Sequence, residues 1–342
     1  SNGQVQFMTL SRQQWWNLPG ATSRSAAYHM NQASFLYPFI STREHGLGFG
    51  IQLNRNSSGE GRLAMTDVVT YTASRTRIKK NIYMDAGVGI GMKQYAIDWD
   101  QLTFTSQLDP FYGVVNSFPL VNPRNGNSSV SISGNAGVLL SAMSKNRRNQ
   151  YKLGTGIYHI NRPGVSFFDE TERINRRFSI HGTYIVFRPP SRGVIGKIGT
   201  SYYVFKHNFQ YQFPLSTAET RVGTNINGIL TIYSGLRRRN YLITNTSSDA
   251  LMWSIQMNTP AFMISVGYDF TISDLNIQRT RGTTEIALTI PLGASRNIRS
   301  RRASEPCYVD YLLTHSEWKA VEQFNKKSTY WGREYSPVTF IR

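Results

Sequence analysis

The chain has 342 residues, a formal net charge of +18 and a mean hydropathy of −0.36, and aromatic residues make up 13% of it. It contains no run of about 18 apolar residues, which excludes a helix that crosses a membrane. Its single cysteine, Cys307, excludes an internal disulfide framework and a metal site built on cysteine alone. The basic excess fits an anionic partner (nucleic acid, lipopolysaccharide or an acidic protein) and equally a solvated basic surface.

Alternating polar and apolar residues predict strands up to about residue 293, because successive side chains of a strand point to opposite faces. The first part of the chain is expected to form strands at 4–16, 23–35, 45–54, 64–78, 82–97, 129–142 and 151–160. The second part is expected to form strands at 177–187, 194–205, 220–230, 233–243, 249–259, 261–272 and 282–293. The pattern therefore predicts an all-β protein of about 14 strands.

Two of these strands carry glycine at every second position, at Gly46, Gly48 and Gly50 and at Gly87, Gly89 and Gly91. A phosphate-binding loop would need a glycine-rich turn that opens a helix, and no helical pattern follows here. Glycine on one face of a strand instead leaves room for bulky groups or for another backbone. We therefore interpret these glycines as structural.

The last two predicted strands separate an apolar face from a polar one. The apolar face of the first is uncharged and holds Phe262, Ile264, Val266, Tyr268, Phe270 and Ile272. The polar faces of the two strands hold Asp269 and Glu285. Each run exceeds the usual strand of about five or six residues and matches the roughly 9–11 residues that a tilted strand needs to cross a bilayer. A soluble sandwich and a membrane barrel both fit this alternation.

The lengths of the connections favour the barrel. Longer connections are expected at 98–127, 161–175 and 206–219, whereas others, such as the proline-bearing 188–193, are short. An even number of strands with short turns on one side and long loops on the other is typical of bacterial outer-membrane barrels. Closure also removes the edge strands of such a long sheet. We predict a transmembrane antiparallel β-barrel over residues 1–293.

The segment 294–342 departs from this pattern and is expected to form a basic, aromatic periplasmic tail. With an even strand count, both termini lie on the short-turn side, which is periplasmic. The candidate partner-binding residues of the tail are Arg299, Arg301, Arg302, Trp318, Phe324, Tyr330 and Trp331. Two roles stay open for the tail: it docks a partner, or it packs against its own barrel.

No catalytic or metal-binding constellation is found. The six histidines are scattered without metal-ligand spacing, and no Gly-x-Ser-x-Gly nucleophile elbow occurs. Asp98, Asp100 and Asp109 lack the register of a calcium loop, and we expect them to cap turns or to pair with arginines inside the barrel. Trp15, in an aromatic-basic cluster, is expected to anchor the barrel at a membrane interface rather than to bind nucleic acid. The sequence thus predicts no enzyme activity, cofactor or bound metal.

Five stretches together resemble the PorP/SprF family of outer-membrane proteins of the type IX secretion system of Bacteroidetes bacteria. They are RQQWW from Arg12, GLGFGIQLN from Gly46, IDWDQLTFTSQLDPFYG from Ile97, GNAGVLLSA from Gly134 and SVGYDFTISDLN from Ser265. The candidate motif residues are Arg12, Gln14, Trp15, Asp98, Asp100, Asp109, Pro110, Tyr268 and Asp269. The resemblance covers about 4–293, and the tail departs from it because most members look as if they stop near the last strand.

The resemblance implies a barrel without enzymatic activity in the bacterial outer membrane. Members associate with the periplasmic ring of the secretion and gliding machinery, or help to secrete and anchor adhesins that carry a specialised C-terminal domain. We therefore expect partners among translocon and ring proteins and a secreted adhesin, together with contact to lipopolysaccharide. Two alternatives remain: a porin or transporter with an open polar lumen, and a soluble basic β-protein that binds nucleic acid.

Overall fold

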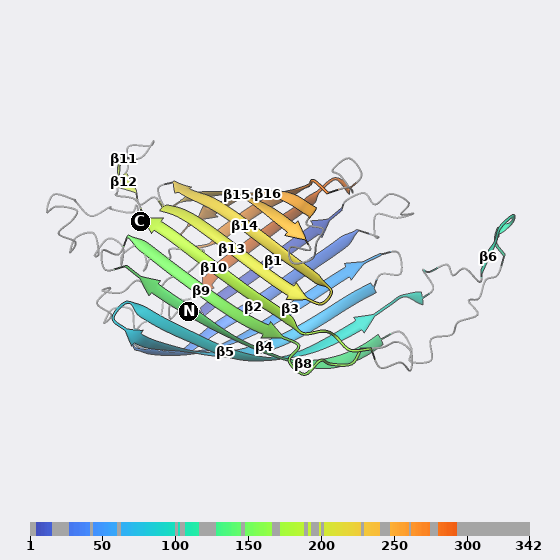
Figure 1. Cartoon of the computed structure of the whole chain (residues 1–342), viewed down its shortest axis with the longest axis horizontal. Helices are drawn as coiled ribbons and strands as arrows, with labels where there is room; N and C mark the ends of the chain where they lie inside the picture. The colour runs from blue at the N-terminus through green and yellow to red at the C-terminus, as the bar shows by residue number, and fades with distance from the viewer. Residues whose placement is uncertain are drawn as a thin grey trace.

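The computed structural model describes residues 5–15, 27–41, 44–59, 63–99, 102, 107–115, 128–144, 148–165, 172–187, 191–192, 198–199, 202–226, 229–239, 247–259, 261–273 and 280–292. Within these residues, long strands form one closed barrel in which every neighbouring pair is antiparallel (Figure 1). Around the ring the order is β1-β18-β17-β16-β15-β14-β13-β10-β9-β8-β5-β4-β3-β2, which makes 14 strands. The predicted fold class is confirmed.

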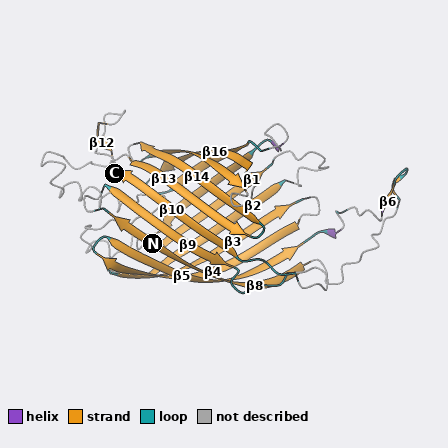
Figure 2. Cartoon of the chain, viewed as in Figure 1, coloured by secondary structure: helices purple, strands orange, loops and turns teal. Residues whose placement is uncertain are grey.

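The barrel strands of the first half are β1 Val5–Gln14, β2 Tyr28–Ser41, β3 His45–Ser58, β4 Leu63–Lys79, β5 Ile82–Ala96, β8 Ser128–Met143 and β9 Asn149–Tyr158. Those of the second half are β10 Arg177–Phe187, β13 Tyr202–Gln212, β14 Leu215–Ile226, β15 Leu230–Arg239, β16 Ser247–Asn258, β17 Met263–Thr271 and β18 Thr283–Leu292. Two small sheets lie outside the barrel: β6 Leu108–Asp109 with β7 Gly113–Val114, and β11 Ser191–Arg192 with β12 Ile198–Gly199. Coloured by secondary structure, the described chain is almost entirely strand (Figure 2).

The first and the last strand close the ring, with pairs that run from Val5 with Leu292 to Gln14 with Thr283. We call the end of the barrel where β1 begins and β18 ends the proximal end, and the opposite end the distal end. The long connections 97–127 and 159–176 are distal, as are 15–27 and 272–282. The proximal connections 42–44, 80–81, 144–148, 227–229 and 259–262 are short. This matches the predicted asymmetry at most positions.

One part of the predicted connectivity is wrong. The expected connection 206–219 lies mostly within β13 and β14, which a tight turn at Phe213 and Pro214 joins. The expected strands 194–205, 220–230 and 233–243 are accordingly shifted, and the expected short connection 188–193 belongs to a longer proximal one, 188–201. The polar residues of β13 resemble a loop in sequence, but in the barrel they face a polar interior, where a strand tolerates them.

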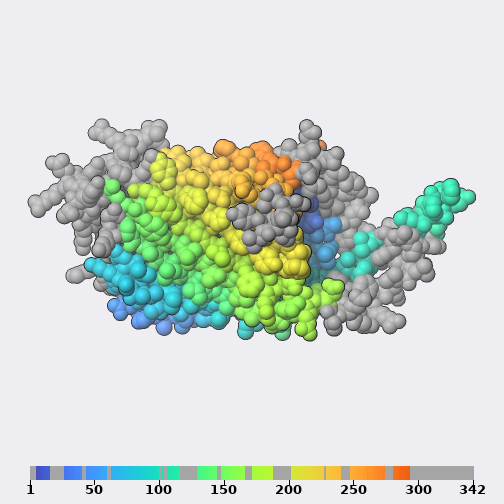
Figure 3. Space-filling view, viewed as in Figure 1, coloured from blue at the N-terminus to red at the C-terminus, as the bar shows by residue number. Residues whose placement is uncertain are grey.

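The two faces of the wall have opposite character, as β5 illustrates. Val88, Ile90 and Met92 point outward and expose 64%, 67% and 53% of their surface. The residues between them, Gly89 and Gly91, are buried on the inside. Figure 3 shows one face of the outer surface, on which successive parts of the sequence lie side by side as tilted bands of colour. An apolar exterior around a polar interior is the arrangement that a lipid-embedded barrel requires.

The inner glycines leave space for rings from neighbouring strands, and Gly89 is the one among them for which this was predicted. A Cβ on Gly89 would lie 2.5 Å from Cδ1 of Tyr71. Added Cβ atoms on Gly154 and Gly223 would collide with the rings of His181 and Tyr233. These glycines therefore let bulky side chains lie flat against the inner wall.

A glycine in β15 offers a test of this packing. In Gly235→Ala the new Cβ would meet the carbonyl oxygen of Thr220 at 2.6 Å and Cγ of Arg221 at 2.8 Å. Because the oxygen belongs to the backbone, the β14–β15 pairing must shift, and we expect a loss of roughly 1–3 kcal/mol in the free energy of unfolding. Urea unfolding in detergent measures it. Gly134→Ala, whose Cβ would meet nothing within 4 Å, is the control and should not destabilise.

Candidate functional site

A cavity of about 500 Å³ lies inside the distal end of the barrel. Residues of β1 to β5 line one side of it and residues of β14 to β16 the other. Since β4 and β15 lie on opposite sides of the ring, this cavity spans the lumen. Its polar lining includes Arg12, Gln14, Glu219, Arg237, Arg239 and Asp249. Its volume is in the range of small-molecule pockets.

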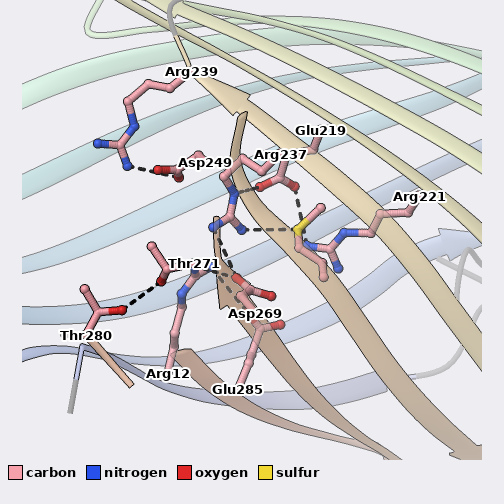
Figure 4. A network of polar contacts seen from close by, with 11 residues as sticks. Arg12, Glu219, Arg221, Arg237, Arg239, Asp249, Asp269, Thr271, Thr280 and Glu285 are labelled. Carbon is pink, nitrogen blue, oxygen red and sulfur yellow. Dashed lines mark hydrogen bonds and ion pairs between the residues drawn. The ribbon is translucent and has the colours of Figure 1, made fainter. Parts of the chain in front are cut away.

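The charged lining belongs to a network of ion pairs along the inner wall (Figure 4). Asp269 bridges two arginines, because its Oδ2 lies 3.1 Å from Arg12 Nη2 and 3.1 Å from Arg237 Nη1. Glu219 also bridges two arginines, with 2.6 Å from its Oε1 to Arg237 Nε and 3.4 Å from its Oε2 to Arg221 Nη2. These contacts tie β1, β14, β15 and β17 together at one level of the lumen.

Two more contacts extend the network. Arg12 Nη1 lies 3.5 Å from Glu285 Oε2, and Arg239 Nη2 lies 3.1 Å from Asp249 Oδ2. The strand register explains why these charges meet: Arg12 pairs directly with Glu285, and Glu219 pairs directly with Arg237. Opposite charges placed directly across neighbouring strands attract each other. Each of these arginines therefore has a carboxylate partner, and the network is balanced in charge.

A second polar cluster lies on the opposite wall, around the buried Lys93 of β5. Lys93 Nζ lies 3.2 Å from Nε2 of the buried His159 and 4.0 Å from Asp67 Oδ2. The backbone N–H of His159 donates to Asn135 Oδ1 over 3.2 Å. When the Lys93 ammonium donates to Nε2, the imidazole of His159 is an acceptor, and the histidine forms part of the polar wall.

The structure brings together three of the sequence-predicted residues at the distal end. Arg12 and Asp269 form an ion pair, and Gln14 lines the same cavity as Arg12. Trp15 follows β1 with a φ of 60° and packs edge to face on Tyr28, with ring centroids 5.1 Å apart. A left-handed backbone at a bulky residue is strained and persists only where the surroundings hold it.

Tyr268 does not join the network, because it lies on the outer face between the inward Gly267 and Asp269. Its hydroxyl donates to the carbonyl oxygen of Arg281 over 2.9 Å, and its ring packs on Phe270 at 4.7 Å. Tyr268 therefore fastens the connection that leads into β18.

The residues predicted in the long distal connection lie apart from the network. Asp109 caps its own turn, because its Oδ1 accepts from the backbone N–H groups of Phe111 and Tyr112 over 2.8 and 3.0 Å. Pro110 lies inside that turn, between β6 and β7, which stand away from the barrel (Figure 1). Asp98 follows β5 and is half-buried. The capping role expected for Asp109 is confirmed.

Other predicted residues lie outside the described part of the chain. They are Asp100, Cys307 and the tail residues Arg299, Arg301, Arg302, Trp318, Phe324, Tyr330 and Trp331. The boundary between barrel and tail at 293 and 294 stays a prediction. So does the choice between docking and self-packing for the tail.

Sequence reasoning missed most of the network. Glu219 fell in a predicted connection, and Arg237, Arg239 and Asp249 were not singled out. A signal existed: these residues occupy the strand ends that the barrel topology brings to the distal end. Ion pairs between strands far apart in sequence depend on register and closure, which alternation does not specify.

The described residues contain no group of three or more His, Cys, Asp or Glu side chains that would hold a metal ion. In the same part of the chain, no helix is both long and apolar enough to span a membrane.

A closed antiparallel barrel with an apolar exterior and a charged, ion-paired interior defines the class of outer-membrane barrels. The chain belongs to the PorP/SprF family: residues 1–290 match the family described as type IX secretion system membrane protein PorP/SprF. It is thus an outer-membrane barrel of a type IX secretion system.

Two solved structures illustrate what the chain is similar to. Omp33 of Acinetobacter baumannii is 6% identical with a TM-score of 0.44, over 85% of this chain and 100% of that chain. The toluene transporter TodX of Pseudomonas putida is 9% identical with a TM-score of 0.43, over 85% and 89% of the two chains. These are distant likenesses of fold. A comparison with curated proteins gives no match.

Proposed function

We propose that this barrel is a non-enzymatic anchoring component of the secretion and gliding machinery. In this proposal the distal end binds a secreted adhesin or a translocon component, and the tail 294–342 contacts the periplasmic ring. The supporting observation is the distal cavity of about 500 Å³ and its ion-paired lining. Preorganised polar groups around a cavity are suited to binding a partner segment.

The orientation is part of the proposal. Short turns of outer-membrane barrels face the periplasm and long loops face the exterior. Most proximal connections are short and the longest connection, 97–127, is distal, which supports a periplasmic proximal end with both termini. Arg55 of β3 and Arg238 of β15 are exposed on the outer face near the distal end. We propose that they contact lipopolysaccharide phosphates.

Co-purification from native membranes tests the proposal. A tagged full-length chain is expected to bring down type IX secretion proteins and a secreted surface protein. A chain that lacks 294–342 is expected to remain inserted but to lose the periplasmic partner, as mass spectrometry would show. If the shortened chain fails to fold, the tail packs on its own barrel, and if both chains capture the same partners, the tail is not the contact.

A porin or transporter is the second candidate, because the cavity spans the lumen between opposite walls. Purified protein in a planar lipid bilayer distinguishes the two. Steady single-channel current would favour the porin, whereas a sealed barrel that still captures its partners would favour anchoring.

A further inference from the structure

Four neighbouring strands of the inner wall differ from the rest in charge. The neighbouring strands β8, β9, β10 and β13 contain no aspartate or glutamate. Their inner faces carry Lys152, Arg177, His181 and Lys206. The carboxylates of the described barrel strands all lie on other strands, at Asp67, Asp85, Glu219, Asp249, Asp269 and Glu285. The lumen therefore has a basic wall that faces an ion-paired one.

The strand register concentrates positive charge on this wall. Lys206 of β13 lies directly opposite Arg221 of β14, and on its other side Thr183 separates it from the buried Lys152. Like charges placed directly across strands repel each other. Arg221 has Glu219 as its carboxylate partner, but it shares that carboxylate with Arg237, whose contact is the shorter one.

Aromatic rings hold two of these cations in place. The guanidinium of Arg177 lies 4.3 Å from the ring centroid of Tyr158, and Lys206 Nζ lies 5.1 Å from that of Tyr233. A ring face attracts a cation without neutralising its charge. Nε of Arg177 is buried and has no hydrogen-bond partner among the described residues. The wall thus presents positioned cations, of which Arg177 also acts electrostatically on Asp67 of β4.

The spacing of the cations indicates the shape of a ligand. Along β10, the distance from Arg177 to Thr183, which is level with Lys206, is roughly 20 Å at about 3.3 Å per residue. The exposed ring of His181 lies between them, over Gly154, where a Cβ would collide with it. A single small anion cannot reach both ends of this row, whereas an extended chain with several carboxylates can.

We propose that the inner wall of β9, β10 and β13 binds an extended acidic peptide segment of a protein partner. The inference rests on the proposed anchoring function and specifies the chemistry of the bound segment. Carboxylates of the segment pair with Arg177 and Lys206, and His181 donates a hydrogen bond between them. Hydrogen bonds between a cationic side chain and a carboxylate are stronger than those between two neutral groups.

Binding of a labelled polyglutamate peptide to the full-length protein in detergent tests the proposal. Fluorescence anisotropy is expected to show saturable binding that Arg177→Gln with Lys206→Gln weakens about tenfold, since two charge-assisted contacts are lost. The matched control, Lys79→Gln with Lys80→Gln, removes equal charge from the exposed β4–β5 turn. It should change affinity less than about twofold, because exposed charges are screened.

Equal weakening by both double variants would mean that overall charge drives binding, and would overturn the proposal, as would no binding at all. Inorganic phosphate that competes as well as the peptide would assign the wall to small anions instead. Arg177→Lys with Lys206→Arg keeps both charges and should retain binding even if the glutamine variant folds poorly. If the protein still captures its partners but does not bind the peptide, this inference is wrong and the proposed anchoring function still stands.

Discussion

The variant Ile90→Arg is expected to fail to insert into lipid vesicles under conditions in which the unchanged protein folds. Ile90 exposes 67% of its surface in the middle of the outer face of β5, between the exposed Val88 and Met92. An arginine on the lipid face of a barrel costs about 2–4 kcal/mol near the middle of the bilayer. The folded fraction is read from heat-dependent mobility on SDS gels after refolding into vesicles.

The matched control places the same residue inside the barrel. Thr217 lines the distal cavity, where an added guanidinium meets water and carboxylates rather than hydrocarbon. Thr217→Arg is therefore expected to insert nearly as well as the unchanged chain, because substitutions in the lumen of a barrel are tolerated. Equal insertion of both variants would show that the outer face of β5 does not touch lipid.

Asp269→Asn is expected to destabilise the barrel by roughly 3 kcal/mol, since removing one partner of a buried ion pair usually costs about 3–5 kcal/mol. Asp269 is the shared partner of Arg12 and Arg237, and the three side chains expose only 14%, 19% and 11% of their surface. Asparagine keeps the size of the side chain but removes the negative charge that the guanidinium groups of Arg12 and Arg237 share. Urea unfolding in detergent measures the change.

The control for this variant is an ion pair whose carboxylate is exposed. Glu44 lies 3.9 Å from Arg77 and its side chain is 67% exposed, so Glu44→Gln should have little effect, as is usual for surface pairs. In the double variant Asp269→Asn with Arg12→Gln, the excess charge is removed, and the total loss should be smaller than the sum of the single losses. Additive losses would mean that Asp269 does not couple to Arg12.

The alternation of residues predicted the barrel because one face of each strand meets hydrocarbon and the other a polar lumen. Ile90 and Gly89 illustrate this. They are adjacent in sequence, so they point to opposite faces of the strand, and this alternation can be read from the sequence. The same rule failed at β13 and β14. Lys206, Asn208 and Gln210 occupy alternate positions of a strand, but together with the intervening His207 they resemble the polar composition of a connection.

The candidate site was only partly predictable. Arg12 and Asp269 were singled out from their stretches of sequence, but their contact crosses β18 and exists only after the ring has closed. Glu219 and Arg237 meet because β14 and β15 pair in one particular register. The register of each strand pair depends on the strands of the whole sheet, which must place their apolar side chains on the same face. A short segment of sequence does not determine that register by itself.

The pairing of β1 with β18 has a consequence for biogenesis. Val5 and Leu292 lie in the first and the last strand of the barrel, yet they are neighbours in the finished wall. Contacts of such long sequence separation form slowly, because loop entropy must be overcome before they contribute. A polypeptide released before β18 has been synthesised would carry two unpaired strand borders. The last strand, β18, therefore closes the barrel and completes the form of the molecule that can be embedded in a membrane.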